Sequence, residues 1–417
     1  MFLPDDVIYH IAVLIHIKNI SILCRLNSRF NKLISTNNYW IKKFLYDYKE
    51  IPDINIVSWR DAYRNYGKVV AFGDNSSGQL GQGHTQKIPS LTQISNIRAK
   101  SISCGEKHTA IIDLKDNVWT FGDGRYGKLG FCNEDNTLVP TLLPRIQAKS
   151  VSCGHDHTII IDLDNNLLGM GSNFYGQLGL GNMDHILVPI KISGMKAKFV
   201  SCGSSHTLII DLNDDVWVFG YNSMGQLGLG DYRYQYKPTP LNMKAKYISC
   251  GYSSTMIIDL NNNLWAFGYN YYGTLGLGDN INRNVPVQIS GIQAKSVSCG
   301  SYHTIVLDIN NAVWAFGSNE CGQLGSSALP ISYIPMQIPK MQAKSISCGR
   351  KYTVIVDLDN NVWTFGTDSH KQLGVTDQIS KPYIPFQISN IKAKSVSSGT
   401  NHRMIILNLD SNLTELQ

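Results

Sequence analysis

Hydrophobic and polar positions alternate along most of this chain, and the alternating segments return in the same order. Within one copy, Lys295–Cys299 alternates larger side chains with very small ones, as in a strand that faces a crowded neighbour. Thr304–Asp308 is rich in β-branched residues, and Asn310–Asn311 after it tolerates a tight hairpin. Ala312–Gly317 is predicted as the third strand. The pattern within each copy of the repeat therefore predicts three consecutive antiparallel strands.

A fourth predicted strand in each copy is short and marked by proline. In the copy above it is Val285–Ile289, which contains Pro286. Proline cannot donate to a strand ladder, so this strand belongs at the edge of its sheet. Four antiparallel strands, with the smallest residues innermost and the proline strand outermost, describe one blade of a β-propeller.

The copies follow one another at a nearly constant period. A Ser-Cys-Gly step recurs at separations of 48 to 50 residues, and Leu-Gly and Ala-Lys pairs recur with it. A strand-based unit of this size, copied in series, buries its faces against its neighbours. We therefore predict an all-β seven-bladed β-propeller with a small N-terminal α-helical domain. The seven marker positions are Cys104, Cys153, Cys202, Cys250, Cys299, Cys348 and Ser398.

The two ends of the repeated region predict how the ring closes. The repeats begin at Val69–Gly73, which corresponds to a third strand, and end after Met404–Leu407, which corresponds to a second strand. Neither end makes a complete blade, so we expect the two ends to combine into the seventh. The predicted propeller spans residues 67–413, and residues 414–417 form a tail.

The repeated motifs resemble those of the regulator of chromosome condensation family. Gly-Gln-Leu-Gly, Ser-Cys-Gly-x-x-His-Thr and Trp-x-Phe-Gly recur in order from residue 69 to about residue 410. The resemblance implies a seven-bladed propeller strongly and a function only weakly.

Residues 1–50 have a different pattern, in which apolar residues follow helical spacing. Leu26, Phe30 and Leu33 fall on one face of a predicted helix. Residues 51–66, which contain Trp59 and Tyr63, predict a short linker helix between this region and the propeller.

This leading region resembles an F-box. The resemblance rests on the opening Leu-Pro, the branched aliphatic residue that follows, the Ser-Arg-Phe step and the final tryptophan. It implies docking on the small adapter subunit of a cullin-RING ubiquitin ligase. A helical cap that packs on the propeller is the alternative. The candidate adapter-binding residues are Leu3, Pro4, Ile8, Leu26, Phe30 and Trp40.

Composition and charge limit the cellular compartments in which this protein is expected. The net charge is +6, 16% of the residues are charged, and no apolar stretch has the length of a membrane span. The acidic start is unlike a signal peptide, and nine cysteines make an odd number, so we expect an intracellular protein, cytoplasmic or nuclear. Abundant Ile, Asn, Lys and Tyr are typical of an AT-rich genome, such as that of a large DNA virus acting in its host cell.

The candidate partner-binding site lies between the glycine and the histidine of the Gly-x-x-His motif. These two residues follow the innermost strand, so we place them at one mouth of the ring. They differ between blades, whereas the framework repeats, and variable loop positions are free to bind a partner. A solvated loop is the alternative. The candidate residues are Glu106, Lys107, His155, Asp156, Tyr252, Tyr302, Arg350, Lys351 and Asn401.

Other repeated residues are interpreted as structural. The histidines of the motif, such as His108, lie in separate blades and cannot gather around one metal ion. The lysines that begin the inner strands, such as Lys100, are interpreted as side chains that extend along a strand edge rather than as a nucleic-acid site. The tryptophans of the third strand, such as Trp314, are interpreted as core. Glycine-rich runs and the segment Asp357–Asn361 are interpreted as turns. We expect no catalytic group, cofactor or metal.

These patterns favour a non-catalytic adaptor. The leading hypothesis is a substrate-recognition subunit of a cullin-RING (SCF-type) ubiquitin ligase, in which the F-box-like region binds the adapter and the propeller binds a target protein. A guanine-nucleotide exchange factor is one alternative, although the regular spacing leaves little room for an inserted wedge. A general protein-interaction propeller is another. An ultraviolet receptor would place tryptophans between the glycine and the histidine, and none is there. Membrane and nucleic-acid partners are not expected.

Overall fold

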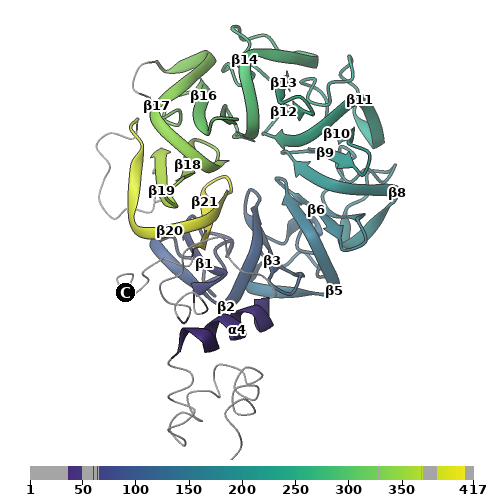
Figure 1. Ribbon diagram of the computed structural model, residues 1–417. Coiled ribbons are helices and arrows are strands. Elements are labelled where there is room, and N and C mark those ends of the chain that lie inside the picture. The colour runs from purple at the N-terminus through teal and green to yellow at the C-terminus, as the bar shows by residue number, and fades with distance from the viewer. Residues whose placement is uncertain are drawn as a thin grey trace, which may run out of the picture.

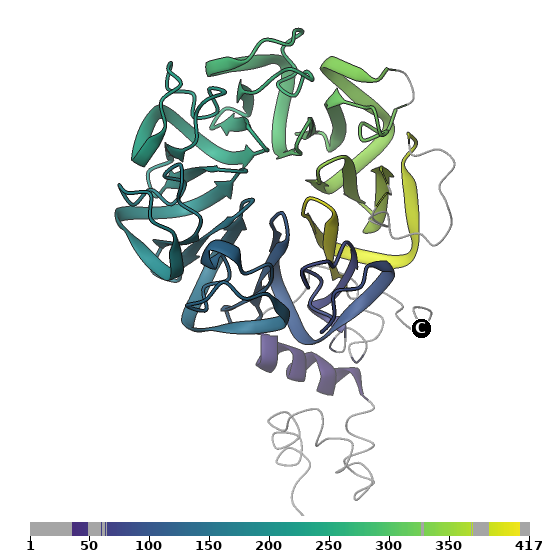
Figure 2. The same cartoon turned by 180° about the vertical axis from the view of Figure 1, so that it is seen from behind.

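The protein is described by a computed structural model, which places residues 36–48, 60, 63, 65–326, 329–367, 369 and 383–408. Within these residues, 21 strands form one closed hydrogen-bonded circuit around a central axis (Figures 1 and 2). The circuit confirms the predicted seven-bladed, almost entirely β fold. No helix in this part of the chain is long and apolar enough to cross a membrane.

Seven long strands run from the outer edge of one blade to the innermost position of the next (Figure 1). The outer strand of one blade and the inner strand of the next were expected to be separate, and the structure joins them into one bent strand. These strands are β2 (Ile88–Cys104), β5 (Thr137–Cys153), β8 (Ile186–Cys202), β11 (Gln235–Cys250), β14 (Arg283–Cys299), β17 (Ile331–Cys348) and β20 (Phe386–Ser398).

The bend has a local backbone cause. The pairing register shifts between the outer and inner parts of each long strand, as between Gln93 and Arg98 of β2. Between those parts, one residue in each of the first six long strands adopts a left-handed conformation, with φ between 56° and 82°. Such a residue lets the strand leave one sheet and enter the next without ending. These residues are Asn96, Arg145, Gly194, Asn242, Gly291 and Lys340.

Shorter strands complete each blade. The second strands are β3 (His108–Asp113), β6 (His157–Asp162), β9 (His206–Asp211), β12 (Ser254–Asp259), β15 (His303–Asp308), β18 (Tyr352–Asp357) and β21 (His402–Leu407). The third strands are β1 (Lys68–Gly73), β4 (Asn117–Gly122), β7 (Asn166–Gly171), β10 (Asp215–Gly220), β13 (Asn263–Gly268), β16 (Ala312–Ser318) and β19 (Asn361–Gly366).

The ring closes by pairing its two ends. Strand β1 pairs with β21 in antiparallel register, from Val69 opposite Ile406 to Gly73 opposite His402. We call the sheet made of β20, β21, β1 and the outer part of β2 the closing blade. Blades 1 to 6 follow it in chain order and begin at the inner parts of β2, β5, β8, β11, β14 and β17. The predicted seventh blade built from both ends is confirmed.

An aspartate and a tryptophan fix the hairpin between the second and third strands. In blade 4, Asp259 Oδ1 accepts the amide N–H groups of Asn261 and Asn263, and its Oδ2 accepts the indole N–H of Trp265 at 3.0 Å. The tryptophan is half-buried, and it packs against a hydrophobic core cluster that joins blades 3 and 4. The interpretation of these tryptophans as core residues is confirmed, and their hydrogen bond to the hairpin aspartate was not predicted from the sequence.

The third-strand phenylalanines form the most deeply buried layer between blades. Phe121, Phe219, Phe267 and Phe316 are fully buried, and each joins apolar residues of two neighbouring blades in one cluster. Burial of an aromatic side chain contributes on the order of 2 kcal/mol, and it is repeated around the ring.

Helix α4 (Asn37–Tyr48) lies at the rim of the ring beside the outer parts of β2 and β5 (Figures 1 and 2). Phe44 of α4 packs against Tyr66, with ring centroids 4.9 Å apart, and Trp40 packs against Tyr63 at 5.3 Å. Arg98 of β2 donates hydrogen bonds to the backbone carbonyls of Tyr63 and Tyr66. These contacts attach α4 to the closing blade.

Candidate functional site

The innermost strands are joined to one another by serine and cysteine. At every boundary between blades, a serine hydroxyl accepts the backbone N–H of the cysteine in the next blade, or of Ser398 in the closing blade, at 2.9 to 3.1 Å. Burial raises the pKa of the Cys153 thiol to about 12. The six cysteines of this motif are buried free thiols, so they contribute to packing and form no disulfide bonds among the residues that the structure describes.

The histidines of the Gly-x-x-His motif also join neighbouring blades, and they lie further from the ring axis than the serine–cysteine contacts of the innermost strands. At five boundaries the histidine Nε2 lies 2.9 to 3.1 Å from a threonine hydroxyl of the next blade. Each threonine donates its own proton to a backbone carbonyl, so it accepts from a histidine N–H. These hydrogen bonds confirm the interpretation of the motif histidines as structural residues. The pairs are His108–Thr158, His157–Thr207, His206–Thr255, His303–Thr353 and His402–Thr109.

Two boundaries depart from this arrangement. Between blades 4 and 5, Ser254 takes the histidine position, and its buried hydroxyl has no hydrogen-bond partner in the described structure. Between blade 6 and the closing blade, Tyr352 takes the position and donates to the carbonyls of Gly399 and His402 at 2.8 Å. The fully buried guanidinium of Arg403 lies over the Tyr352 ring, 4.0 Å from its centroid. Tyrosine and arginine together replace histidine and threonine there.

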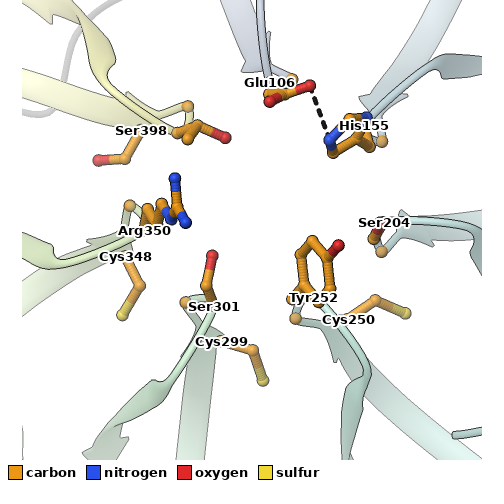
Figure 3. Close-up of a pocket in the computed structure, with 18 of the residues that line it drawn as sticks. Glu106, His155, Ser204, Cys250, Tyr252, Cys299, Ser301, Cys348, Arg350 and Ser398 are labelled. Carbon is orange, nitrogen blue, oxygen red and sulfur yellow. Dashed lines mark ion pairs between the residues drawn. The ribbon is translucent and has the colours of Figure 1, made fainter. Parts of the chain in front are cut away.

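The Gly-x-x-His loops form a ring of tips around a central recess of about 100 Å³ (Figure 3). The first variable residue of each tip lines the recess, so Glu106, His155, Tyr252 and Arg350 face the axis. The second variable residue does not line it. Its backbone carbonyl accepts an N–H from the loop that follows the third strand of the same blade. These second residues include Lys107, Asp156, Tyr302, Lys351 and Asn401.

The tips are held to one another by backbone contacts. Arg350 N–H donates to the carbonyl of Thr400 at 3.3 Å, and Thr400 N–H donates to that of Gly105 at 3.4 Å. These contacts place the blade 6 tip and the blade 1 tip on either side of the closing blade tip. Only Tyr252 and Arg350 are exposed among the candidate tip residues, and the others are half-buried.

An ion-pair network links blades 1 and 2 at the tips. Lys128 is fully buried, and its Nζ lies 2.7 Å from Asp123 Oδ2 and 2.6 Å from Asp156 Oδ1. Asp156 also contacts Nδ1 of His155, and His155 Nε2 contacts Glu106 at 2.7 Å.

The protonation states in this network follow from its geometry. Burial alone would lower the pKa of His155, but hydrogen bonds to Asp156 and Glu106 outweigh burial and raise the pKa to about 9. Burial of Asp123 is outweighed by Arg125 and Lys128, which lower the pKa of Asp123 to about 2. His155 is therefore a cation between two carboxylates. Its two ring nitrogens face different carboxylates, and both are engaged in these contacts. Glu106, His155 and Asp156 also place one ligand atom each within 4.8 Å of the others, as a group that could hold a metal ion.

Sequence reasoning placed three members of this network at the tips and missed the buried Lys128, together with Asp123 and Arg125. The signal was present, because Lys128 stands in a Gly-Lys-Leu-Gly step where other copies have glutamine. In the closing blade, the equivalent Gln79 donates to a carboxylate oxygen of Asp74 and accepts the backbone N–H of Ser77, so an uncharged side chain takes the place of the lysine.

Tyrosines gather at the tips and loops of blades 4 and 5. Tyr272, in the loop after β13, packs edge-on against Tyr302 of the blade 5 tip, with ring centroids 5.1 Å apart. Tyr271 packs on Tyr272 at 5.1 Å and is 59% exposed. Tyr252 at the blade 4 tip is 49% exposed. We call Tyr252, Tyr271, Tyr272 and Tyr302 the tyrosine sector.

The repeated lysines at the start of the inner strands bind within their own blades. Lys100 Nζ contacts Asp116 Oδ1 at 2.7 Å, and Lys149 and Lys295 contact Asn165 and Asn311 at 2.8 Å. In each case the partner lies in the hairpin between the second and third strands. These contacts favour a structural role over an anion-binding ring.

Among the candidate adapter-binding residues, the structure describes Trp40 only. Its side chain is 3% exposed and packs against Tyr39 and Tyr63, so it contributes to the joint and offers no surface to an outside protein in this conformation. The remaining candidates, Leu3, Pro4, Ile8, Leu26 and Phe30, lie outside the described residues.

Comparison with known sequences identifies the repeats. The sequence model of the regulator of chromosome condensation (RCC1) repeat matches residues 66–112, 115–161, 164–210, 213–258, 261–307, 310–356 and 359–406. A second model with the same description matches five stretches between residues 99 and 323. No curated protein sequence matches the chain significantly.

Comparison with solved structures shows the same fold. Human WBSCR16 is 22% identical, with a TM-score of 0.71 over 81% of this chain and 98% of that protein. Yeast RCC1 (Prp20), solved with Kap60, is 17% identical, with a TM-score of 0.73 over 86% of this chain and 94% of that one. Prp20p of Saccharomyces cerevisiae, studied for its binding to Gsp1p and histones, is 17% identical. Its TM-score is 0.72 over 84% of this chain and 94% of that one. At these identities the likeness is one of fold.

Proposed function

Because the chain belongs to the regulator of chromosome condensation (RCC1) repeat family, we propose that its propeller is a rigid, non-catalytic platform that binds a protein partner at the ring of tips. The observation that carries this proposal is a contrast within each blade. The contacts of the Ser-Cys-Gly step repeat at all seven boundaries and the His-Thr contacts at five, whereas the tip residues between them change from blade to blade. Surfaces that vary on a fixed frame suit recognition.

The tips also have the physical properties of a protein-binding site. Arg350 and Tyr252 are exposed and belong to the residue types that dominate interface energies. The backbone of each tip is held by a hydrogen bond to the loop that follows the third strand of the same blade. The tips therefore lose little conformational entropy when a partner binds.

We further propose that residues 1–50 connect this platform to the adapter subunit of a cullin-RING ubiquitin ligase, through Leu3, Pro4, Ile8, Leu26 and Phe30. The support is the F-box resemblance of that region. The contacts of α4 with Tyr63 and Tyr66 add to it, because they fix the end of the region to the propeller rim. A target bound at the tips would then be held near the ligase at a raised effective concentration.

Binding of the full-length chain to the purified adapter subunit tests this function. We expect a stable complex that Leu3→Ala with Pro4→Ala abolishes, and that Arg350→Glu with Lys351→Glu leaves intact. Lys191→Ala, at an exposed position on β8, is a matched control on the propeller rim. Absence of a complex with the unaltered chain would refute the adapter role and leave the platform role to the tip variants.

Guanine-nucleotide exchange is the second candidate. The observation in its favour is the shared fold with Prp20p, which was studied for binding to Gsp1p. Release of a fluorescent guanine nucleotide from a small GTPase, measured with and without the chain, distinguishes the two functions. Acceleration that is lost on Arg350→Glu would favour exchange over the adaptor function.

A further inference from the structure

The charged residues at the tips do not contribute equally to the field that a partner meets. The network between blades 1 and 2 contains the cations Arg125, Lys128 and His155, and the carboxylates Glu106, Asp123 and Asp156. Three positive and three negative groups cancel, and they lie within ion-pair distance of one another. This network therefore offers a partner little net charge.

Three charged tip residues remain outside the network, and all of them are cations. Lys107 belongs to the blade 1 tip, and Arg350 and Lys351 belong to the blade 6 tip. None of the three forms an ion pair among the residues that the structure describes. The backbone contacts through Thr400 bring these two tips to either side of the closing blade. We call Lys107, Arg350 and Lys351 the cationic sector.

The tyrosine sector belongs to the tips and loops of blades 4 and 5, and the blade 5 tip is next to the blade 6 tip of the cationic sector. Figure 3 shows Tyr252 on the far side of the recess from Ser398 of the closing blade, with Arg350 directed toward the axis. Tyrosine presents a large apolar face with one polar atom and has few rotatable bonds, so it binds apolar side chains at a small entropic cost. The mouth of the ring thus has one cationic side and one aromatic side.

We propose that the tip face binds an acidic peptide segment of a partner protein, with a carboxylate against Arg350 in the recess and a neighbouring apolar or aromatic side chain on the tyrosine sector. Lys351 and Lys107, beside the recess, add positive charge that attracts the segment. The proposal rests on the proposed function and specifies its partner. A recess of about 100 Å³ has room for one carboxylate side chain between the first-position residues. Arginine binds such a group in a two-pronged geometry.

A nucleic acid fits this face less well than a peptide. A phosphate backbone requires a track of cations spaced along its length, whereas the unpaired cations are confined to the two tips that flank the closing blade tip. The tyrosine rings at Tyr271, Tyr272 and Tyr302 pack edge-on, at 89° and 67°, rather than as parallel platforms for bases.

Selection from a random dodecapeptide library displayed on phage tests the proposal with the full-length chain as bait. We expect enriched peptides to carry Asp or Glu close to Phe, Leu, Trp or Tyr. Synthetic copies are then measured by fluorescence anisotropy. Arg350→Glu with Lys351→Glu should weaken their binding at least about tenfold, and added salt should weaken it further. Tyr252→Ala should weaken it by a smaller factor without changing the salt dependence.

Matched controls separate this effect from a general change of charge or folding. Lys191→Glu makes the same charge change at an exposed position away from the tips and should leave peptide affinity unchanged. Thermal unfolding of each variant establishes that the ring is intact. A peptide with Lys in place of Asp and Glu should fail to bind the unaltered chain and should bind the Arg350→Glu, Lys351→Glu chain more tightly.

The outcomes distinguish this inference from the proposed function. Selected peptides without acidic residues that still lose affinity on Tyr252→Ala would overturn the acidic class and keep the tips as the binding site. Peptides unaffected by any tip variant would overturn both. Binding of a single-stranded oligonucleotide that displaces the acidic peptides and is lost on Arg350→Glu would replace the peptide by a nucleic acid.

Discussion

The boundary between blades 1 and 2 and the boundary between blades 4 and 5 are built from the same repeat but are held together differently. At the first, the His108–Thr158 hydrogen bond is joined by the Lys128–Asp156 and His155–Glu106 ion pairs. At the second, Ser254 replaces the histidine, and its hydroxyl has no partner among the described residues.

This difference teaches that a repeat specifies the shape of a ring without specifying the strength of each boundary. The Ser-Cys contacts are alike at both boundaries, at 2.9 Å for Cys153 and 3.1 Å for Cys299. The variation lies in side chains that reach from one blade into the next. Substitutions and conditions that act on one boundary and leave the other unchanged test this interpretation.

Acid should have the largest effect, because it acts on every boundary that contains a histidine. Burial lowers the pKa of His157, His206 and His303 to about 3. Each is therefore neutral in the folded chain, and each takes up a proton on unfolding below about pH 6.5. The contribution of each histidine to the free energy of unfolding is therefore fully present above about pH 6.5. As the pH decreases from there toward the pKa of the folded state, each histidine lowers this free energy by about 1.4 kcal/mol per pH unit.

Urea unfolding measured from pH 7 to pH 4 checks this expectation. His155 does not contribute to the loss, because its raised pKa gives stability that is present below pH 6.5 and disappears as the pH rises through about 9. His206→Gln stays neutral and should lower the pH slope by the share of one histidine. A free energy of unfolding that is constant between pH 7 and pH 5 would contradict the buried neutral histidines.

Lys128→Met should have the next largest effect and should act on the boundary of blades 1 and 2. It removes the only cation within 4 Å of Asp156 other than His155, and one of two such cations near Asp123, within the structure as described. Leaving carboxylates buried beside an apolar side chain costs about 3–5 kcal/mol. Thermal and urea unfolding measure the loss.

Lys128→Gln is the matched control for this substitution. Glutamine occupies the equivalent position in other blades, at Gln79, Gln177, Gln226 and Gln323. It can donate to one carboxylate, so we expect a smaller loss than for methionine. Equal stability of Lys128→Met and the unaltered chain would show that the network contributes nothing to this boundary.

Ser254→His should strengthen the boundary of blades 4 and 5. A histidine there would bring its Nε2 toward Thr304, whose hydroxyl already donates to the carbonyl of Thr274 and can accept. We expect a gain of about 1 kcal/mol, the net value of one hydrogen bond. Ser254→Ala should be nearly neutral, because the hydroxyl that it removes has no partner. Amide hydrogen exchange in β12 and β15 reports the change locally, and slower exchange in the alanine variant than in the histidine variant would contradict it.

Arg145→Gly should have the smallest effect. Arg145 holds a left-handed φ of 62° where β5 bends into blade 2, whereas Gly291 occupies the same bend of β14 with a φ of 82°. Glycine relieves the strain of this conformation but loses more entropy on folding, so we expect a gain of about 0.5 kcal/mol. The reverse change, Gly291→Ala, should destabilise by about 1 kcal/mol, although its side chain would meet open space. A loss of melting temperature in Arg145→Gly would assign the arginine a contact that outweighs its backbone strain.

Local patterns predicted the ring and its frame because each depends on neighbours that recur at the same distance in sequence. The small residues around Cys299 predicted the innermost strand, and the split of the last blade between Val69–Gly73 and Met404–Leu407 predicted the closure. The tryptophans were interpreted as core from their place in the third strand, which does not reveal that the indole N–H of Trp265 also binds Asp259 at the hairpin. Each long bent strand was predicted as two separate strands, because a proline and a turn residue within it resemble the end of a strand.

The sequence alone determined the repeat, the number of blades and the identity of the variable tips, since these follow from residue types at a fixed spacing. The tertiary structure decided which charges cancel. Lys128 and Asp156 are 28 residues apart and belong to different blades, so only the folded ring shows that they meet inside a buried network. It also decided that Lys107 and Arg350 stand on either side of the closing blade. Electrostatic interaction depends on distance and burial, and both are set by the way the blades are arranged.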